Sequence, residues 1–121
     1  MRNRENIIVV KSYAFALRIV RLYKFLTEEK REFVLAKQIL RSGTSIGANI
    51  SEAQSTETKN DFIHKMGIAA KEILETLYWL NLLHDGKFTE QTPFEAIRQD
   101  CQELLRITNS IVLTTRQALI K

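Results

Sequence analysis

Apolar residues recur every three or four positions along four long runs of this chain, and that spacing restricts the fold more than any other feature of the sequence. It is the period of an amphipathic α-helix that buries one face. The runs cover about 6–28, about 33–55, 58–83 and 92–121. Because connections of about three to ten residues favour antiparallel neighbours, the sequence predicts an all-α fold, an antiparallel up-and-down four-helix bundle.

Each run contributes one stripe of side chains to the expected core. In chain order these stripes are Phe15, Ile19, Leu22 and Leu26; Leu35 or Ala36, Ile39, Gly43, Ile46, Ile50 and Ala53; Phe62, Met66, Ala69, Ile73, Leu77 and Leu80; and Phe94, Ile97, Cys101, Leu104, Thr108, Ile111, Thr115 and Ala118.

Capping signals mark the starts of the last two helices. Before the third run, Thr58 and Asp61 can form a capping box, or Asn60 can cap alone. Before the fourth, Thr92 is the expected N-cap, with Pro93 at the first helical position and a glutamate three residues after the cap. We therefore expect the fourth helix to begin at Pro93.

The composition is that of one compact helical domain. The chain has 121 residues, 45% of them hydrophobic, with a single proline and four glycines. It is long enough to bury a core, and one domain, 1–121, accounts for all of it. The same composition argues against disorder and against a turn-rich β fold. A single cysteine excludes an internal disulfide, which fits the cytoplasm, the location we expect.

No run of about 18 uncharged apolar residues is present, so we expect no membrane span. The apolar run near the N-terminus is broken by Lys11 and Arg18, and no small-residue cleavage site follows it, so we expect no signal peptide.

The stretch LRSGTSIGANISEAQ, residues 40–54, interrupts the pattern with two glycines and several short polar residues. A phosphate-binding loop would need a preceding strand and a lysine soon after the glycines, and both are missing. A turn between two shorter helices is the second reading, because each glycine costs about 1 kcal/mol in a helix. A turn would reset the helical register, yet Ile39, Ile46 and Ile50 keep it. We therefore expect a continuous helix whose face is narrow at Gly43 and Gly47.

Beside the glycines runs a polar stripe at steps of three and four residues, made of Ser42, Ser45, Asn49 and Glu52. If exposed, these groups are simply solvated. If they are buried between helices or subunits, each needs a hydrogen-bond partner, since an unpaired one costs roughly 1–3 kcal/mol. We expect the stripe to be at least partly covered.

Three segments resemble a known family: KSYAFALRIVRLYKFL (11–26), FVLAKQILRSGTSIGANISEAQ (33–54) and KNDFIHKMGIAAKEILETLYWLNLL (59–83). They look like the four-helix bundle proteins encoded in intervening sequences of bacterial 23S ribosomal RNA genes. The accessory variability proteins of diversity-generating retroelements share that fold. The resemblance covers residues 7–88, and its most specific piece is RSGTSIGANISEA.

The resemblance implies a barrel-like homopentamer without known catalysis, and for the accessory members a basic surface that binds nucleic acid and a reverse transcriptase. The residues that match in type at the centre of the second helix read as helix or subunit packing positions: Arg41, Ser42, Gly43, Ser45, Gly47, Asn49 and Glu52. The matching basic residues on the first two helices are Arg18, Arg21, Lys24, Lys37 and Arg41. The net charge of +4 is modest beside that of the accessory members.

Candidates for chemistry are weak, and we expect no enzyme, no cofactor and no metal. His64 and His84 are twenty residues apart, which separates them by about 30 Å on a helix. Cys101 falls in a core register and reads as an inert buried thiol. Glu72 and Glu75 share a helix face, but Lys71 and Glu75 suggest a surface ion pair.

Two surface features remain. Trp79 and its neighbours Tyr78 and Leu82 fall partly outside the third core stripe, which suggests an apolar patch at a subunit interface or, alternatively, a wide core face. Lys and Arg outnumber Asp and Glu by ten to four in residues 1–51, against eight to ten in 52–121. The basic half favours either a polyanion, RNA or DNA bound without sequence specificity, or acidic surfaces of neighbouring subunits. The first reading is a nucleic-acid-associated homo-oligomeric scaffold, and the second a pure protein-interaction module.

Overall fold

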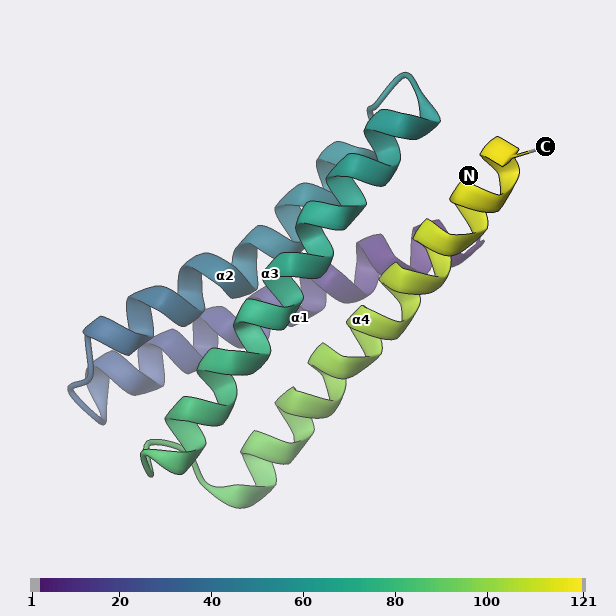
Figure 1. The fold of residues 1–121 in the computed structure, drawn as a ribbon. Helices are drawn as coiled ribbons and strands as arrows, with labels where there is room; N and C mark the ends of the chain where they lie inside the picture. The colour runs from purple at the N-terminus through teal and green to yellow at the C-terminus, as the bar shows by residue number, and fades with distance from the viewer. Residues whose placement is uncertain (1–2, 121) are drawn as a thin grey trace.

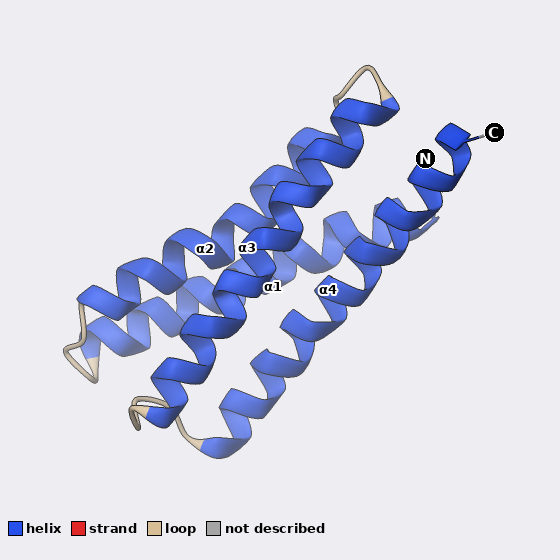
Figure 2. Ribbon diagram, in the orientation of Figure 1, coloured by secondary structure: helices blue, strands red, loops and turns tan. Residues whose placement is uncertain are grey.

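The computed structural model describes residues 3–120 as four helices, with side chains described from residue 7 onward. They are α1 (Asn3–Glu28), α2 (Val34–Ala53), α3 (Lys59–Asp85) and α4 (Gln91–Ile120). The helices run alternately up and down, and short loops join them (Figures 1 and 2). No strand occurs within the described residues. The predicted up-and-down four-helix bundle is confirmed.

The helices form a closed cycle in chain order. Neighbouring helices pack closely at α1–α2, α2–α3, α3–α4 and α4–α1, whereas the backbones of the diagonal pairs α1–α3 and α2–α4 do not come close to each other within the described residues. Of the four seams, α1–α4 is the least closely packed. The diagonal placement of α1 and α3 means that their outer surfaces face away from each other.

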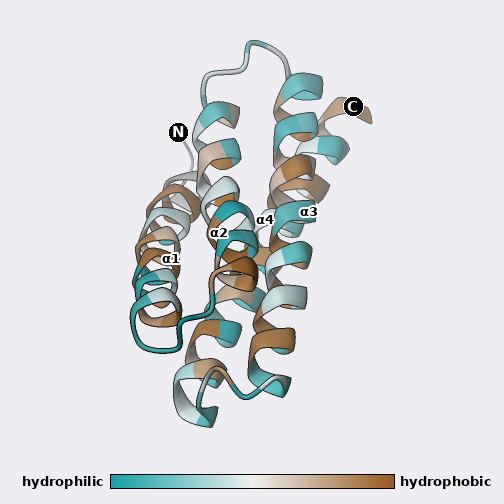
Figure 3. Ribbon diagram, turned by 90° about the vertical axis from the view of Figure 1, so that its left-hand side faces the viewer, coloured by the Kyte–Doolittle hydropathy of each residue, from teal (hydrophilic) through white to brown (hydrophobic). Residues whose placement is uncertain are grey.

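The core lies along the axis of this cycle and contains most of the expected stripes. Hydrophobic and hydrophilic segments alternate along each helix, as expected for helices with one buried face (Figure 3). Ala36 rather than Leu35 holds the core position at the start of α2. Leu22, Phe62 and Leu77 pack against the core from its edge. The prediction for Ala118 is wrong, because the last turn of α4 is exposed and projects past the core.

The core also holds small polar side chains that the apolar pattern does not identify. Ser12, Ser42 and Thr76 are fully buried. Each of them hydrogen-bonds to a backbone oxygen or to another hydroxyl. A buried hydroxyl without a hydrogen-bond partner would lose more free energy than the small side chain gains by packing. The local hydrogen bonds therefore allow these three hydroxyl groups to be buried.

The helix starts differ in how well the sequence predicts them. Thr58 is the N-cap of α3, and its hydroxyl accepts the backbone N–H of Asp61 at 3.1 Å, as expected. At the start of α2 the cap is a residue that the sequence pattern does not predict. The carboxylate of Glu32 accepts hydrogen bonds from the backbone N–H groups of Leu35 and Ala36. Both bonds satisfy donors that a helix start otherwise leaves free.

The prediction that Thr92 caps α4 is wrong. The helix begins two residues earlier than expected, since the N–H of Phe94 already bonds to the backbone oxygen of Glu90 at 3.0 Å. Pro93 lies in the first turn, where N–H groups have no intrahelical partner, so its missing donor costs nothing there. The expected capping glutamate, Glu95, instead accepts a bond from the side chain of Gln91.

Candidate subunit and nucleic-acid interfaces

The middle of α2 is a continuous helix through both glycines, and its narrow face meets α1. A Cβ placed on Gly43 would lie 2.7 Å from Cγ1 and 2.8 Å from Cγ2 of Ile19, which is fully buried. A Cβ on Gly47 would lie 3.3 Å from the backbone oxygen of Ser12. The two glycines therefore allow α1 to approach α2 closely within one subunit.

The neighbouring polar stripe faces α3 and is covered only in part. Ser42 is fully buried, while Ser45 and Asn49 are half-buried and Glu52 is exposed. The Ser45 hydroxyl bonds to the backbone oxygen of Arg41 at 2.6 Å, and the Asn49 amide to that of Ser45 at 2.9 Å. Glu52 pairs with Lys65 of α3 at 2.6 Å. Each residue of the stripe therefore has a hydrogen-bond or ion-pair partner within its own subunit.

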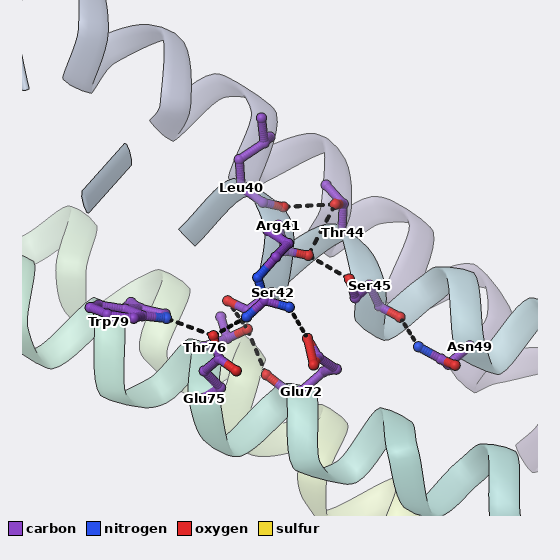
Figure 4. A network of polar contacts seen from close by, with 10 residues as sticks. All are labelled: Leu40, Arg41, Ser42, Thr44, Ser45, Asn49, Glu72, Glu75, Thr76 and Trp79. Atoms are coloured by element: carbon purple, nitrogen blue, oxygen red, sulfur yellow. Dashed lines mark hydrogen bonds and ion pairs between the residues drawn. The ribbon is translucent and has the colours of Figure 1, made fainter. Parts of the chain in front are cut away.

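At the α2–α3 seam a buried hydroxyl pair continues into a surface ion cluster (Figure 4). The Thr76 oxygen lies 2.7 Å from the backbone oxygen of Glu72 and 3.0 Å from the Ser42 hydroxyl oxygen. A hydroxyl has one hydrogen, so Thr76 donates to Glu72 and accepts from Ser42. The two helices are thus joined by a hydrogen bond that water does not reach.

The ion cluster consists of Arg41, Glu72, Glu75 and Trp79. Arg41 bonds to Glu72 at 3.2 Å and also to Glu75, and the Trp79 indole N–H donates to Glu75 at 3.0 Å. The hydrogen bonds from Trp79 and Arg41 lower the pKa of Glu75, and the hydrogen bond to Glu75 raises the pKa of Arg41. Glu75 therefore pairs across the seam, and the expected Lys71–Glu75 pair within α3 is not formed.

The five basic residues predicted to bind nucleic acid do not form one surface. Arg18 pairs with Asp100 of α4, and Arg41 pairs with α3, so these two residues point toward opposite edges of the bundle. Arg21, Lys24 and Lys37 are exposed and form no ion pair with any described residue. Lys24 near the end of α1 and Lys37 in the first turn of α2 lie close to the α1–α2 loop.

Further basic and aromatic residues lie at this same end, which sequence reasoning did not single out. Lys30 lies over the Phe25 ring, with Nζ 5.7 Å from the centroid, and Arg31 lies over the Phe33 ring at 5.8 Å. Both rings are exposed. We call the basic end the cationic residues near the α1–α2 loop together with these rings: Arg21, Lys24, Phe25, Lys30, Arg31, Phe33 and Lys37. Three glutamates, Glu28, Glu29 and Glu32, lie near the same loop, and Glu90 lines a cleft together with Arg21 and Phe25.

Two apolar stripes occupy the outer surfaces of diagonal helices. On α1 the exposed fractions are 67% for Val10, 68% for Tyr13 and 42% for Leu17. These three residues form the α1 stripe, and their spacing of three and four places them on one face.

On α3 the exposed residues follow a spacing of four, with Leu74 at 55%, Tyr78 at 59% and Leu82 at 39%. They form the α3 stripe. Trp79 is not part of it, because its ring packs on the core and its N–H is bonded to Glu75. The wide core face that the sequence left open describes Trp79, whereas Tyr78 and Leu82 are exposed. An excess of apolar residues beyond one core stripe is the sequence signal for both surfaces.

The chemical groups that could react are poorly placed for reaction. Cys101 is buried, and burial, with a smaller contribution from the Asp100 charge, raises its pKa to about 12, so the thiol stays protonated. His84 is stacked on Phe94, with ring centroids 4.0 Å apart. Among the residues that the structure describes, no three His, Cys, Asp or Glu side chains gather as a metal site. No helix within 3–120 is long and apolar enough to cross a membrane.

Comparison with known proteins places the chain in a family. A crystal structure of a protein with unknown function from the S23 ribosomal protein family, from Bacteroides thetaiotaomicron, is 50% identical and superposes with a TM-score of 0.89, covering 90% of this chain and 97% of that one. No curated protein matches the sequence. The family model described as 23S rRNA-intervening sequence protein matches residues 4–110. The chain therefore belongs to the family of 23S rRNA-intervening sequence proteins.

Proposed function

We propose that this protein is a non-enzymatic, homo-oligomeric scaffold that associates with nucleic acid through its basic end. The observation that carries the proposal is the pair of apolar stripes on diagonal helices. Each stripe exposes two aliphatic side chains and a tyrosine to water. Contiguous apolar surface of this kind is typical of a subunit interface.

The placement of the stripes favours a ring. Because α1 and α3 are diagonal in the four-helix cycle, the stripes on their outer surfaces face away from each other on opposite sides of one subunit. A two-fold dimer would pair a patch with itself and leave the other patch exposed. If the α1 stripe of one copy packs on the α3 stripe of the next, every stripe is covered once the ring closes. Five subunits is the number that the family resemblance implies.

The basic end supplies the nucleic-acid contact. Five cations face four glutamates there, and the exposed Phe25 and Phe33 rings offer stacking surfaces for unpaired bases. One subunit would bind weakly, but copies repeated around a ring add their phosphate contacts by multivalency. The described residues present no base-reading element, so the binding expected is insensitive to sequence and steeply dependent on salt.

A salt titration tests this proposal. Dissociation constants for single-stranded RNA, a structured RNA and duplex DNA are measured between low and moderate salt. The triple variant Lys24→Gln, Lys30→Gln, Lys37→Gln is compared with a variant of equal charge, Lys59→Gln, Arg106→Gln, Arg116→Gln, altered at exposed positions elsewhere. We expect the first variant alone to reduce the slope of log K against log salt on single-stranded RNA, by about 2 per subunit for three lost phosphate contacts.

The second candidate function is a protein-interaction module without a nucleic-acid role. The observation in its favour is that Arg18 and Arg41 already form ion pairs within the subunit. If wild-type protein binds none of the three nucleic acids even at low salt, the nucleic-acid role is abandoned and this function remains. Equal losses in both triple variants would also remove the basic end as the binding surface.

A further inference from the structure

The loosely packed α1–α4 seam contains a cleft of about 410 Å³ whose apolar interior the proposed function does not use. Its volume falls in the range of about 300–1,000 Å³ typical of small-molecule sites. Its walls and floor are mainly apolar side chains from α1, α3 and the start of α4: Leu22, Phe25, Leu80, Pro93, Phe94 and Ile97. Four polar residues complete the lining, namely Arg18, Arg21, Thr89 and Glu90.

The Arg18–Asp100 ion pair crosses this seam. A second hollow of about 150 Å³ lies between α1 and α4 along the seam, and Arg18 and Asp100 both line it. Arg18 lines both hollows and therefore lies where the two adjoin.

Two polar groups in the larger cleft lack partners. Arg21 makes no ion pair with a described residue, and its guanidinium lies at the exposed rim. The Thr89 hydroxyl oxygen is buried and has no hydrogen-bond partner within the described chain. A buried hydroxyl without a partner usually marks a place where a ligand or water completes the bonding. The Glu90 carboxylate also lines the cleft and repels an anion, so the arginines are the groups suited to the charged end of a ligand.

We propose that the cleft binds a small organic anion with an apolar body, such as an aryl or alkyl carboxylate or sulfonate. The body lies on Leu22, Phe94 and Ile97, and the acidic group meets Arg21 at the rim. An apolar floor with one positively charged end is complementary to such a molecule, because the body leaves water while the charge stays at the surface. The cleft shares Arg21 and Phe25 with the basic end, whereas its other lining residues lie outside that surface.

A pair of probes that differ only in charge tests the site. 8-Anilinonaphthalene-1-sulfonate carries the anionic group, and N-phenyl-1-naphthylamine has the same aromatic body without it. Binding of each to the full chain is followed by fluorescence and by calorimetry. We expect Arg21→Gln to weaken the sulfonate probe by about fivefold to tenfold and to leave the neutral probe unchanged, since only the first loses a charge-assisted contact. Lys37→Gln, which removes the same charge from an exposed position on α2, should affect neither probe.

Filling the cleft gives a second, independent result. Leu22 is only partly buried, so Leu22→Trp can place a ring in the cleft and should abolish binding of both probes. Its helical circular dichroism and urea midpoint establish that it folds, and Ile97→Phe serves in its place if it does not. The proposal is overturned if wild-type protein binds neither probe. It is also overturned if both probes bind the folded cleft-filling variants with the same affinity as they bind wild-type protein.

Discussion

Gly43 and Gly67 are both inside helices, yet their surroundings differ completely. At Gly43, the space that a methyl group would need is occupied by three carbon atoms of Ile19, at 2.7–3.0 Å. At Gly67 no atom lies within 4 Å of that position. Helix propensity alone predicts the same effect of adding a methyl group at both glycines. Any difference between the two sites must therefore come from side-chain packing.

Alanine substitution should therefore act in opposite directions at the two sites. Gly67→Ala should stabilise the protein by up to about 1 kcal/mol, the propensity gain of alanine over glycine. Gly43→Ala gains the same propensity but forces a buried, stiff β-branched side chain to move, which costs about 1–3 kcal/mol. We expect a net loss of about 1 kcal/mol, measured as the change in free energy of unfolding by urea denaturation.

A double-mutant cycle identifies the cause. Ile19→Ala removes all three carbon atoms that the new methyl group would meet. In that background, Gly43→Ala should become neutral or stabilising, although Ile19→Ala itself costs about 2–5 kcal/mol. A loss that persists in the Ile19→Ala background would show that contact with Ile19 is not the reason for the glycine.

At the scale of the elements, the sequence predicts the features that depend only on residues within the same helix. The core stripes, the continuity of α2 and the Thr58 cap follow from residues within one turn of each other. The start of α4 did not follow, because the helix begins at Gln91 and so extends by about half a turn beyond the start at Pro93 that the capping pattern predicts.

Partners on other helices were beyond the local pattern. Glu75 has Lys71 four residues earlier in its own helix as a possible ion-pair partner. The local sequence does not distinguish Arg41 of α2 from an ordinary solvated arginine. Only the neighbour relation between α2 and α3 decides that Arg41 reaches Glu75 and that Ser42 meets Thr76. Which cations remain for a polyanion therefore could not be predicted from the sequence.

The α2–α3 seam should lose stability in acid through Glu75. Its pKa in the folded protein is lowered from the ordinary value of 4.5. The contribution is therefore present above pH 4.5 and is lost as the pH falls through the lower, folded value. Because Arg41 and Glu75 are partly exposed, we expect only about 0.5–1 kcal/mol. Glu75→Gln should lower the free energy of unfolding by this amount at pH 7, and its difference from wild type should shrink as the pH falls toward 3.

Urea denaturation between pH 3 and pH 7 measures that difference, with Glu57→Gln as the control, since Glu57 lies in the α2–α3 loop and forms no ion pair with a described residue. If Glu57→Gln gives the same pH dependence as Glu75→Gln, the seam is not its source.

At the scale of the whole molecule, the two apolar stripes are the basis of the proposed assembly. The core explains why each helix has one buried face, but it does not explain Tyr13 or Tyr78, whose exposed fractions are 68% and 59%. Because the stripes lie on diagonal helices, contact between unlike stripes is the only pairing that covers both with one repeated interface.

The variants Tyr13→Asp and Tyr78→Asp test this pairing. Each buries an unpaired charge in the proposed contact, so each should raise the dissociation constant of the oligomer by about a hundredfold or more, measured by sedimentation velocity over a range of concentrations. Leu113→Asp, at an exposed apolar position of α4, should leave assembly unchanged. When Tyr13→Asp and Tyr78→Asp proteins are mixed, the intact α3 stripe of the first faces the intact α1 stripe of the second, and a one-to-one pair should form that grows no further. A contact between like stripes would instead let only one of the two variants dissociate the oligomer, and a monomeric wild type would remove the ring altogether.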